Sequence, residues 1–124
     1  METDALYLIV RQVEAGHYRF AVSPAHFQEV GAIRDREERT EVTALLQRLA
    51  LPLIACDRDE ARARATALHA AGIGVADAAH VAFAEQMADC LITCDHALLK
   101  RCRRIGVKIA VMNPIEFIAN ELTP

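Results

Sequence analysis

The sequence predicts a three-layer α/β domain, in which a parallel sheet of about four strands is flanked by helices on both faces. The first observation is that short β-like apolar runs alternate with segments of helical period, a pattern typical of parallel sheets. The second is the length of 124 residues, which suits one domain and is too short for two ordinary cores. With 53% hydrophobic and 25% charged residues, the composition excludes a disordered chain. We therefore predict a single domain over residues 1–124.

The first half of the chain carries an amphipathic helix, a short strand and two further helical segments. Residues 4–15 place apolar side chains on one helical face, and residues 18–23 (YRFAVS) form a β-like run. A Ser-Pro pair then opens a helix that reaches about residue 33, because Ser is a favoured N-cap and Pro suits the first turn. Residues 35–41 are charged and predict a solvated stretch. A helix over 42–49 follows, with apolar residues at i, i+3, i+4 and i+7.

The second half alternates strands and helices more regularly. A weaker strand over 51–56 contains Pro, which suits a sheet edge, and an Ala- and Arg-rich helix over 60–71 follows and ends at a Gly-X-Gly break. A nearly all-apolar helix over 77–88 leads into a strand. The remaining predicted elements are a strand over 89–93, a basic helix over 97–105 ended by Gly, a strand over 107–112, and a last helix over 115–121 capped by Asn-Pro.

The basic residues are concentrated in one part of the chain. The net charge is −3 and the pI is about 5.9, which disfavours nucleic-acid binding by bulk charge. No acidic residue stands between Asp95 and Glu116, and this interval holds Lys100, Arg101, Arg103, Arg104 and Lys108. The run predicts a phosphate-binding patch beside Asp95, with a solvated helix face as the plainer alternative.

Three carboxylates are placed where an α/β sheet would bring chemistry together. Glu29 lies on the second turn of the helix after the first strand, Asp77 begins a helix, and Asp95 follows the strand over 89–93. Because ligands of such sheets bind beyond the carboxyl ends of the strands, we expect these acids to converge. Converging carboxylates repel one another unless a hard cation such as Mg²⁺ or Mn²⁺ bridges them. The alternatives are N-caps for Asp77 and Asp95 and a solvent-facing position for Glu29.

Other polar residues have plainer interpretations. Asp57 and Asp59 resemble an acid-pair loop, but their position favours charges at the start of a helix. His80 lies one turn after Asp77 and could share its face. A packed, hydrogen-bonded histidine is the favoured interpretation over a ligand.

The four cysteines lack the spacing of a disulfide scaffold, so we predict reduced thiols and a cytoplasmic protein. Cys90, Cys94, His96 and Cys102 also lack a paired C-x₂-C spacing, which favours buried thiols over a zinc site. No apolar run reaches a membrane-spanning length and no signal-peptide pattern is present, so no membrane association is expected.

The stretch Gly72–Ile118 resembles the second half of a PIN domain. Its motifs follow the family's order: Asp77-x-x-His80, Asp89 ahead of an apolar strand, Thr93-x-Asp95, Leu98-Leu99, and Asn113-Pro114-x-Glu116-Phe117. Upstream, the strand and helix around Glu29 resemble the family's second strand and its acidic helix. The resemblance covers nearly the whole chain from about Asp4, and the ordered combination is more specific than any single motif.

This resemblance implies a metal-dependent ribonuclease, since most PIN domains are, and the family includes the toxins of VapBC toxin–antitoxin pairs. It implies that Glu29, Asp77 and Asp95 are catalytic residues that hold Mg²⁺ or Mn²⁺, and that the ion activates water for attack on an RNA phosphodiester. The implied partners are RNA, held by the basic run from Lys100 to Arg104, and an antitoxin protein. PIN-like toxins commonly pair, and together with the apolar helix over 4–15 this predicts a homodimer.

The chain departs from the family pattern at its start. The family opens with an apolar strand leading into Asp-Thr/Ser-Asn/Ser, which supplies the first acid of the site. Here Glu2-Thr3-Asp4 echoes the motif, but no apolar strand precedes it. We therefore expect a domain that is N-terminally truncated relative to the family, with an incomplete acidic site, weak or absent metal binding, and cleavage that is weak or undetectable.

Two other functions stay open. A catalytically degenerate PIN module would bind RNA or a protein partner without cleaving it. A receiver-like signalling domain also places acids at strand ends, but it needs an acid pair after the first strand and a Lys after the last. Here Met112-Asn113-Pro114 follows the last strand, which disfavours this hypothesis.

Overall fold

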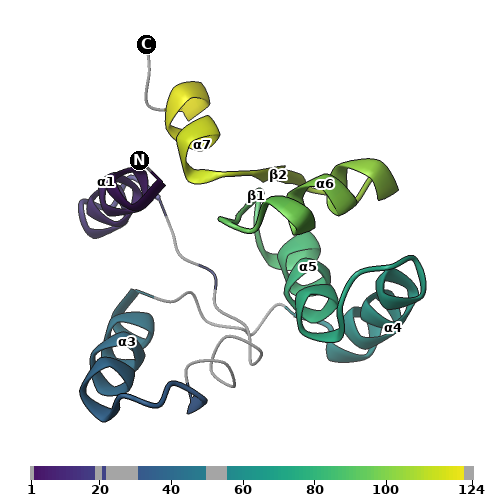
Figure 1. Cartoon of the computed structure of the whole chain (residues 1–124), viewed down its shortest axis with the longest axis horizontal. Helices are drawn as coiled ribbons and strands as arrows, with labels where there is room; N and C mark the ends of the chain where they lie inside the picture. Colours follow the sequence, from purple (N-terminus) through teal and green to yellow (C-terminus); the bar gives the residue numbers. More distant parts are fainter. Residues whose placement is uncertain (1, 19–20, 22–30, 50–55, 122–124) are drawn as a thin grey trace.

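The computed structural model describes residues 2–18, 21, 31–49 and 56–121 of the chain (Figure 1). The elements in this part, in chain order, are α1 (Glu2–Glu14), α3 (Arg36–Leu49), α4 (Arg58–Ala70), α5 (Val75–Met87), β1 (Cys90–Ile92), α6 (His96–Ile105), β2 (Ala110–Met112) and α7 (Pro114–Glu121). Helices and strands alternate from α5 onward, as the sequence predicts. None of the described helices is long and apolar enough to span a membrane.

The sheet is a parallel pair within the described residues. β1 pairs with β2 in the register Cys90 to Ala110 and Ile92 to Met112, and α6 makes the crossover between them. The two strands match the predicted ones but are shorter. The predicted strands over 18–23 and 51–56 lie largely outside the described residues, so the expected number of about four strands is not confirmed.

The late start of β2 has a visible cause. The N–H of Val107 donates to the Cys102 carbonyl at 3.3 Å, which closes the end of α6. The N–H of Lys108 donates to Glu85 Oε2 at 2.8 Å. Two backbone donors at the start of the predicted strand are therefore bound outside any ladder, and pairing begins only at Ala110.

The main core lies between α4, α5, α6 and β2. α4 and α5 pack against each other, and α6 adds one apolar face (Figure 1). The residues of this core are Ala61, Leu68, Ile73, Ala78, Val81, Ala82, Leu98, Leu99, Cys102 and Val111. α5 and α6 each supply three of them, but α5 is the most apolar helix and contacts both α4 and β1, so it forms the centre of this layer.

A second contact joins the two ends of the chain, where α1 packs against α7 (Figure 1). Ala5, Ile9 and Val13 are buried along α1, which confirms the predicted amphipathic helix. Tyr18 then meets Phe117 of α7 edge to face, with ring centroids 5.3 Å apart.

The helix predicted over 42–49 begins earlier than expected, because α3 already starts at Arg36, inside the charged stretch over 35–41. Asp35 Oδ1 accepts from the N–H groups of Glu37 at 2.9 Å and Glu38 at 3.1 Å. This local N-cap, with acidic residues in the first turn, starts the helix ahead of its first apolar residue. The side chains described in this charged segment are nevertheless largely exposed, as expected.

Two other helices also begin earlier than predicted. α4 starts at Arg58 because Asp57 is its N-cap and accepts from the Glu60 N–H at 3.1 Å, which confirms Asp57 as a helix-start charge. α5 starts at Val75 with Gly74 as its N-cap, and no side chain caps it. The N-cap alternative for Asp77 is therefore wrong: Asp77 is the third helical residue of α5.

Candidate functional site

Asp95 lies where the sequence predicts it, just beyond the carboxyl end of β1 and at the start of α6. Its Oδ1 accepts from the Leu98 N–H at 3.0 Å, and its own N–H donates to Thr93 Oγ1 at 3.0 Å. The residue is exposed. The N-cap alternative is thus confirmed, yet it does not compete with ligand binding, because capping uses one of the two carboxylate oxygens.

Asp77 is half-buried in the first turn of α5. Its Oδ2 lies 3.9 Å from the position that a Cβ on Gly74 would take, so the N-terminus of α5 closes over it. Burial raises the pKa of the Cys102 thiol, and the charges of Asp77 and Glu85 raise it further. The charge of Asp77 thus acts on Cys102, about two turns into the helix that Asp95 caps.

Convergence of the three predicted acids stays a prediction, since Glu29 lies outside the described residues. The described ranges contain no group of three or more His, Cys, Asp or Glu side chains that could hold a metal ion. Asp77 and Asp95 nevertheless offer carboxylate oxygens, the hard donors that Mg²⁺ and Mn²⁺ prefer. Thr93 and the cap also hold Asp95 in place.

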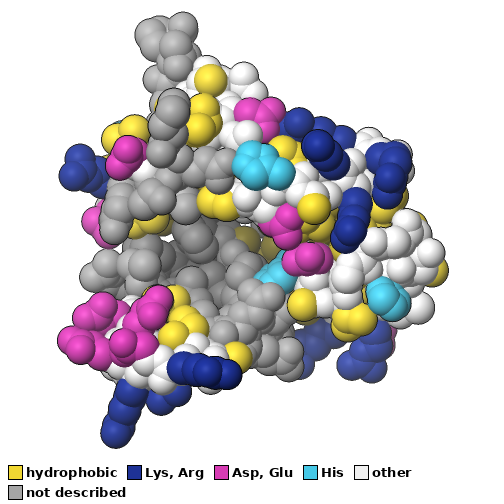
Figure 2. Space-filling view, in the orientation of Figure 1, with side chains coloured by type: hydrophobic (Ala, Val, Ile, Leu, Met, Phe, Trp, Pro, Cys, Tyr) yellow, Lys and Arg dark blue, Asp and Glu magenta, His cyan; other side chains and the backbone are white. Residues whose placement is uncertain are grey.

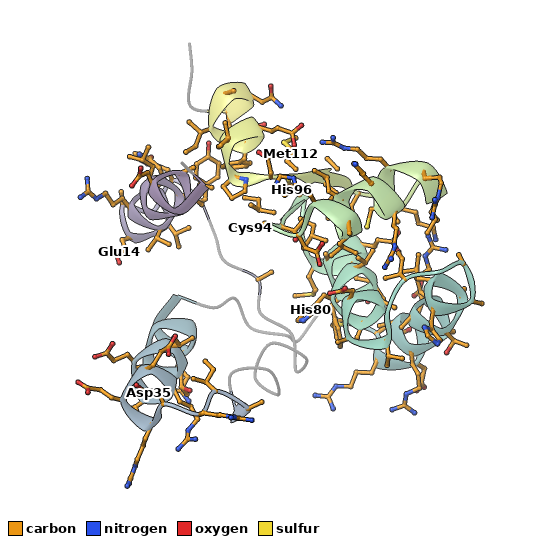
Figure 3. All side chains as sticks on the ribbon, in the orientation of Figure 1. Glu14, Asp35, His80, Cys94, His96 and Met112 are labelled. Atoms are coloured by element: carbon orange, nitrogen blue, oxygen red, sulfur yellow. The ribbon has the colours of Figure 1, made fainter. Side chains whose placement is uncertain are left out.

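Two histidines lie on the side of the molecule seen in Figure 3. His80, one turn after Asp77, is half-buried and projects from α5 on the side away from α4. His96 lies near Cys94 and Met112, around the β1–α6 turn and the end of β2. Cys94, His96 and Met112 lie at or just beyond the carboxyl ends of the two described strands, which is where the sequence predicts the site.

The cysteines fit the predicted role of small hydrophobic residues in part. All four belong to the described residues and none is in a disulfide. Cys102 is buried in the core and Cys90 is half-buried, but Cys94 is exposed, so the predicted burial of its thiol is wrong. Burial raises the pKa of the Cys90 thiol, as it does for Cys56.

The basic residues of α6 form a surface opposite its apolar face. Leu98, Leu99 and Cys102 are buried, whereas the four predicted RNA-binding residues are exposed. These residues are Lys100, Arg101, Arg103 and Arg104. Figure 2 shows Lys and Arg side chains gathered over α6, with acidic side chains beside them where α5, β1 and α6 meet. We call the exposed side of α6 that carries these four residues the basic face.

Arg103 differs from its neighbours on the basic face because it is bound within the protein. Its Nη2 donates to Glu116 Oε2 at 2.8 Å and to the Val111 carbonyl at 3.2 Å. Glu116 in turn accepts from the Asn113 N–H at 3.1 Å, while its own N–H donates to Asn113 Oδ1 at 2.8 Å. This is a capping box at the start of α7, and the Asn-Pro-x-Glu sequence is the signal that could have identified it.

Glu85 is a further acid that sequence reasoning did not single out. Its side chain is only 5% exposed and accepts from Arg64 Nε at 2.8 Å and Nη2 at 3.2 Å. Burial would raise the pKa of this carboxyl, but the hydrogen bonds from Arg64 and the Lys108 N–H, with both charges, outweigh it and lower the pKa. Glu85 thereby joins α4, α5 and the turn before β2.

Comparison with known proteins identifies one family. The PIN domain pattern matches residues 2–104, a range that contains Glu29, Asp77, Asp95 and the whole basic face. No curated protein and no solved structure matches the chain.

Proposed function

The chain belongs to the PIN domain family, a nuclease superfamily, and from this premise we propose that it is a divalent-metal-dependent endoribonuclease. In this proposal Glu29, Asp77 and Asp95 hold Mg²⁺ or Mn²⁺, and the basic face binds the RNA backbone. The observation that carries the proposal is the position of Asp95, which is exposed at the strand end and begins the helix that presents the basic face.

The metal ion would supply a water of lowered pKa and neutralise charge on the scissile phosphate. The residues of the chain provide the remaining functions. Thr93 and the α6 cap fix the backbone around Asp95, so its carboxylate is positioned before substrate arrives. Lys100, Arg101 and Arg104 attract the phosphates electrostatically, which compensates locally for the net charge of −3.

The second candidate is an RNA-binding PIN module that does not cleave. It is favoured by the cap that Asp95 makes, because this contact gives the residue a structural role that needs no metal. The basic face likewise needs no metal to bind phosphate. Both candidates predict RNA binding, so only cleavage separates them.

The experiment is cleavage of a structured RNA by the 124-residue chain with Mg²⁺ or Mn²⁺, compared with the same reaction in EDTA. We expect EDTA to abolish cleavage and Asp95→Asn to reduce it on the order of 100-fold or more, because a ligand charge is lost. Asn is as good an N-cap as Asp, so the folding of this variant should be unchanged. Asp89→Asn, an exposed acid before β1, is the matched control and should retain cleavage.

The possible outcomes separate the candidates. Cleavage that persists in Asp95→Asn would contradict the carboxylate site. Salt-dependent RNA binding with no cleavage under any metal condition would favour the second candidate instead.

The proposal extends to a VapC-type toxin that acts as a homodimer in the cytoplasm and is bound by an antitoxin protein. Two exposed apolar side chains on adjacent helices support self-association. Leu8 of α1 is 45% exposed and Ile115 of α7 is 38% exposed. In this proposal a second copy covers both side chains and removes this apolar surface from water.

A further inference from the structure

The four cations of the basic face are not equivalent. Arg103 donates two hydrogen bonds inside the protein, to Glu116 and to the Val111 carbonyl. Lys100, Arg101 and Arg104 form no ion pair with any other described residue. A cation whose donors are already bound to a carboxylate has less charge to offer a phosphate than an exposed one in water.

The Val111 carbonyl lies on the outer edge of β2, the edge that pairs with no other strand among the described residues. The Met112 carbonyl accepts from the Thr93 N–H at 2.9 Å, so it points toward β1. Successive carbonyls of a strand point to opposite sides, and the Val111 carbonyl therefore points away from β1. Open edges expose such groups to pairing with other chains, and the guanidinium of Arg103 occupies this one.

Glu116 is fixed independently of Arg103. Its Oε1 accepts from the Asn113 N–H in the capping box, which leaves Oε2 for the guanidinium. The hydrogen bond from Arg103, followed by that from Asn113, lowers the pKa of Glu116, so the carboxylate is ionised at neutral pH. Arg103, Glu116 and β2 line one groove of about 360 Å³ at this edge.

Building on the RNA-binding function proposed above, we propose that Glu116 withdraws Arg103 from the basic face and fixes it across the outer edge of β2. Arg103 is then a positioning residue that links α6 to β2 and α7. Lys100, Arg101 and Arg104 are the residues that contact phosphate. This replaces the assignment of Arg103 to RNA binding that the sequence suggested.

The test is the salt dependence of binding to a single-stranded RNA oligonucleotide, measured by fluorescence anisotropy with the full chain. Affinity falls as salt rises, and each lost phosphate contact makes this dependence shallower. The magnitude of the slope of log affinity against log salt decreases by about 0.7 per contact for single strands. We expect this decrease for Lys100→Gln and Arg104→Gln, and no change of slope for Arg103→Gln. Glu116→Gln keeps the capping box, releases Arg103 and should raise the slope by up to about 0.7.

The double variant Arg103→Gln/Glu116→Gln separates release of Arg103 from general loss of negative charge. If Glu116 acts through Arg103, the gain seen in Glu116→Gln disappears in the double variant. A gain that persists there, or a slope for Arg103→Gln that falls as far as for Lys100→Gln, overturns the proposal.

A second measurement needs no RNA. Arg103→Gln should lower the thermal unfolding midpoint by a few degrees, whereas Lys100→Gln should leave it unchanged. An Arg103→Gln variant as stable as the parent overturns the positioning role. If the parent and all variants fail to bind RNA while this difference in stability is present, the proposed RNA function fails and the edge role of Arg103 stands.

Discussion

Two consecutive helices, α5 and α6, differ in how their apolar and charged side chains are distributed. α5 is largely apolar around its circumference and buries Ala78, Val81, Ala82 and Ala84. α6 buries one face and presents the basic face on the other. α5 therefore stabilises the layer by burial, whereas α6 is anchored by the same core and presents its charged side chains to solvent.

The ends of the two helices differ in the same way. The N-cap of α5 is Gly74, which has no side chain to cap it, whereas Asp95 caps the start of α6 and Gly106, with a φ of 77°, follows its end. Only glycine adopts such a φ at little cost, so the end of α6 is set sharply before the turn to β2. The helix that carries the candidate site is thus the one whose ends are fixed by local chemistry.

The largest expected effect is in α5. Val81→Asp places a carboxylate at a position with 0% exposure and no partner, which should cost about 4 kcal/mol or more of unfolding free energy. The measurement is urea unfolding followed by circular dichroism. Val75→Asp, on the same helix at 71% exposure, is the control and should stay within about 0.5 kcal/mol. Equal destabilisation of the two variants would contradict α5 as the centre of the core.

A smaller effect is expected where α5 meets the turn before β2. Glu85→Gln loses charged hydrogen bonds to Arg64 and Lys108 and should cost about 2 kcal/mol at pH 7. The control is Glu121→Gln, which changes an exposed acid of α7.

This cost should depend on pH. The folded pKa of Glu85 is lowered, so its contribution is complete above the unfolded value of about 4.3 and is lost as the pH falls through the folded pKa. The difference between the parent and Glu85→Gln, measured by urea unfolding across this range, should therefore shrink below about pH 4. A difference that grows with acid would contradict the ion pair.

The smallest effect is at the start of α6. Asp95→Ala removes the cap and should cost about 1 kcal/mol, whereas Asp95→Asn should cost only a few tenths. Asp77→Asn in α5 should also cost little, because Asp77 makes no cap there. The measurement is the thermal unfolding midpoint of each of the three variants, which ranks these costs in stability. A cost for Asp77→Asn equal to that of Asp95→Ala would remove the contrast between the two helices.

Several features of the candidate site could be predicted from the sequence because their causes are local. The caps at Asp95 and Asn113 each bind a backbone N–H three residues later. The basic helix that Asp95 begins is likewise visible in the local pattern of charged and apolar residues. The start of α3 at Arg36 also has a local cause, the cap made by Asp35. This start was missed because the first residues of the helix are charged and show no apolar periodicity. The convergence of Asp77 and Asp95 with Glu29 stays a prediction.

The alternation of elements, the two faces of α6 and the position of Asp95 therefore follow from local sequence patterns. Which charged groups are bound inside the protein depends instead on how distant segments pack together. Glu85 meets Arg64 across 21 residues and the Lys108 N–H across 23, and Arg103 meets Glu116 across 13. Residue type alone cannot distinguish Arg103 from Arg104 or Glu85 from an exposed acid. The free energy of a charge depends on its burial and its partner, and packing brings that partner from a distant part of the chain.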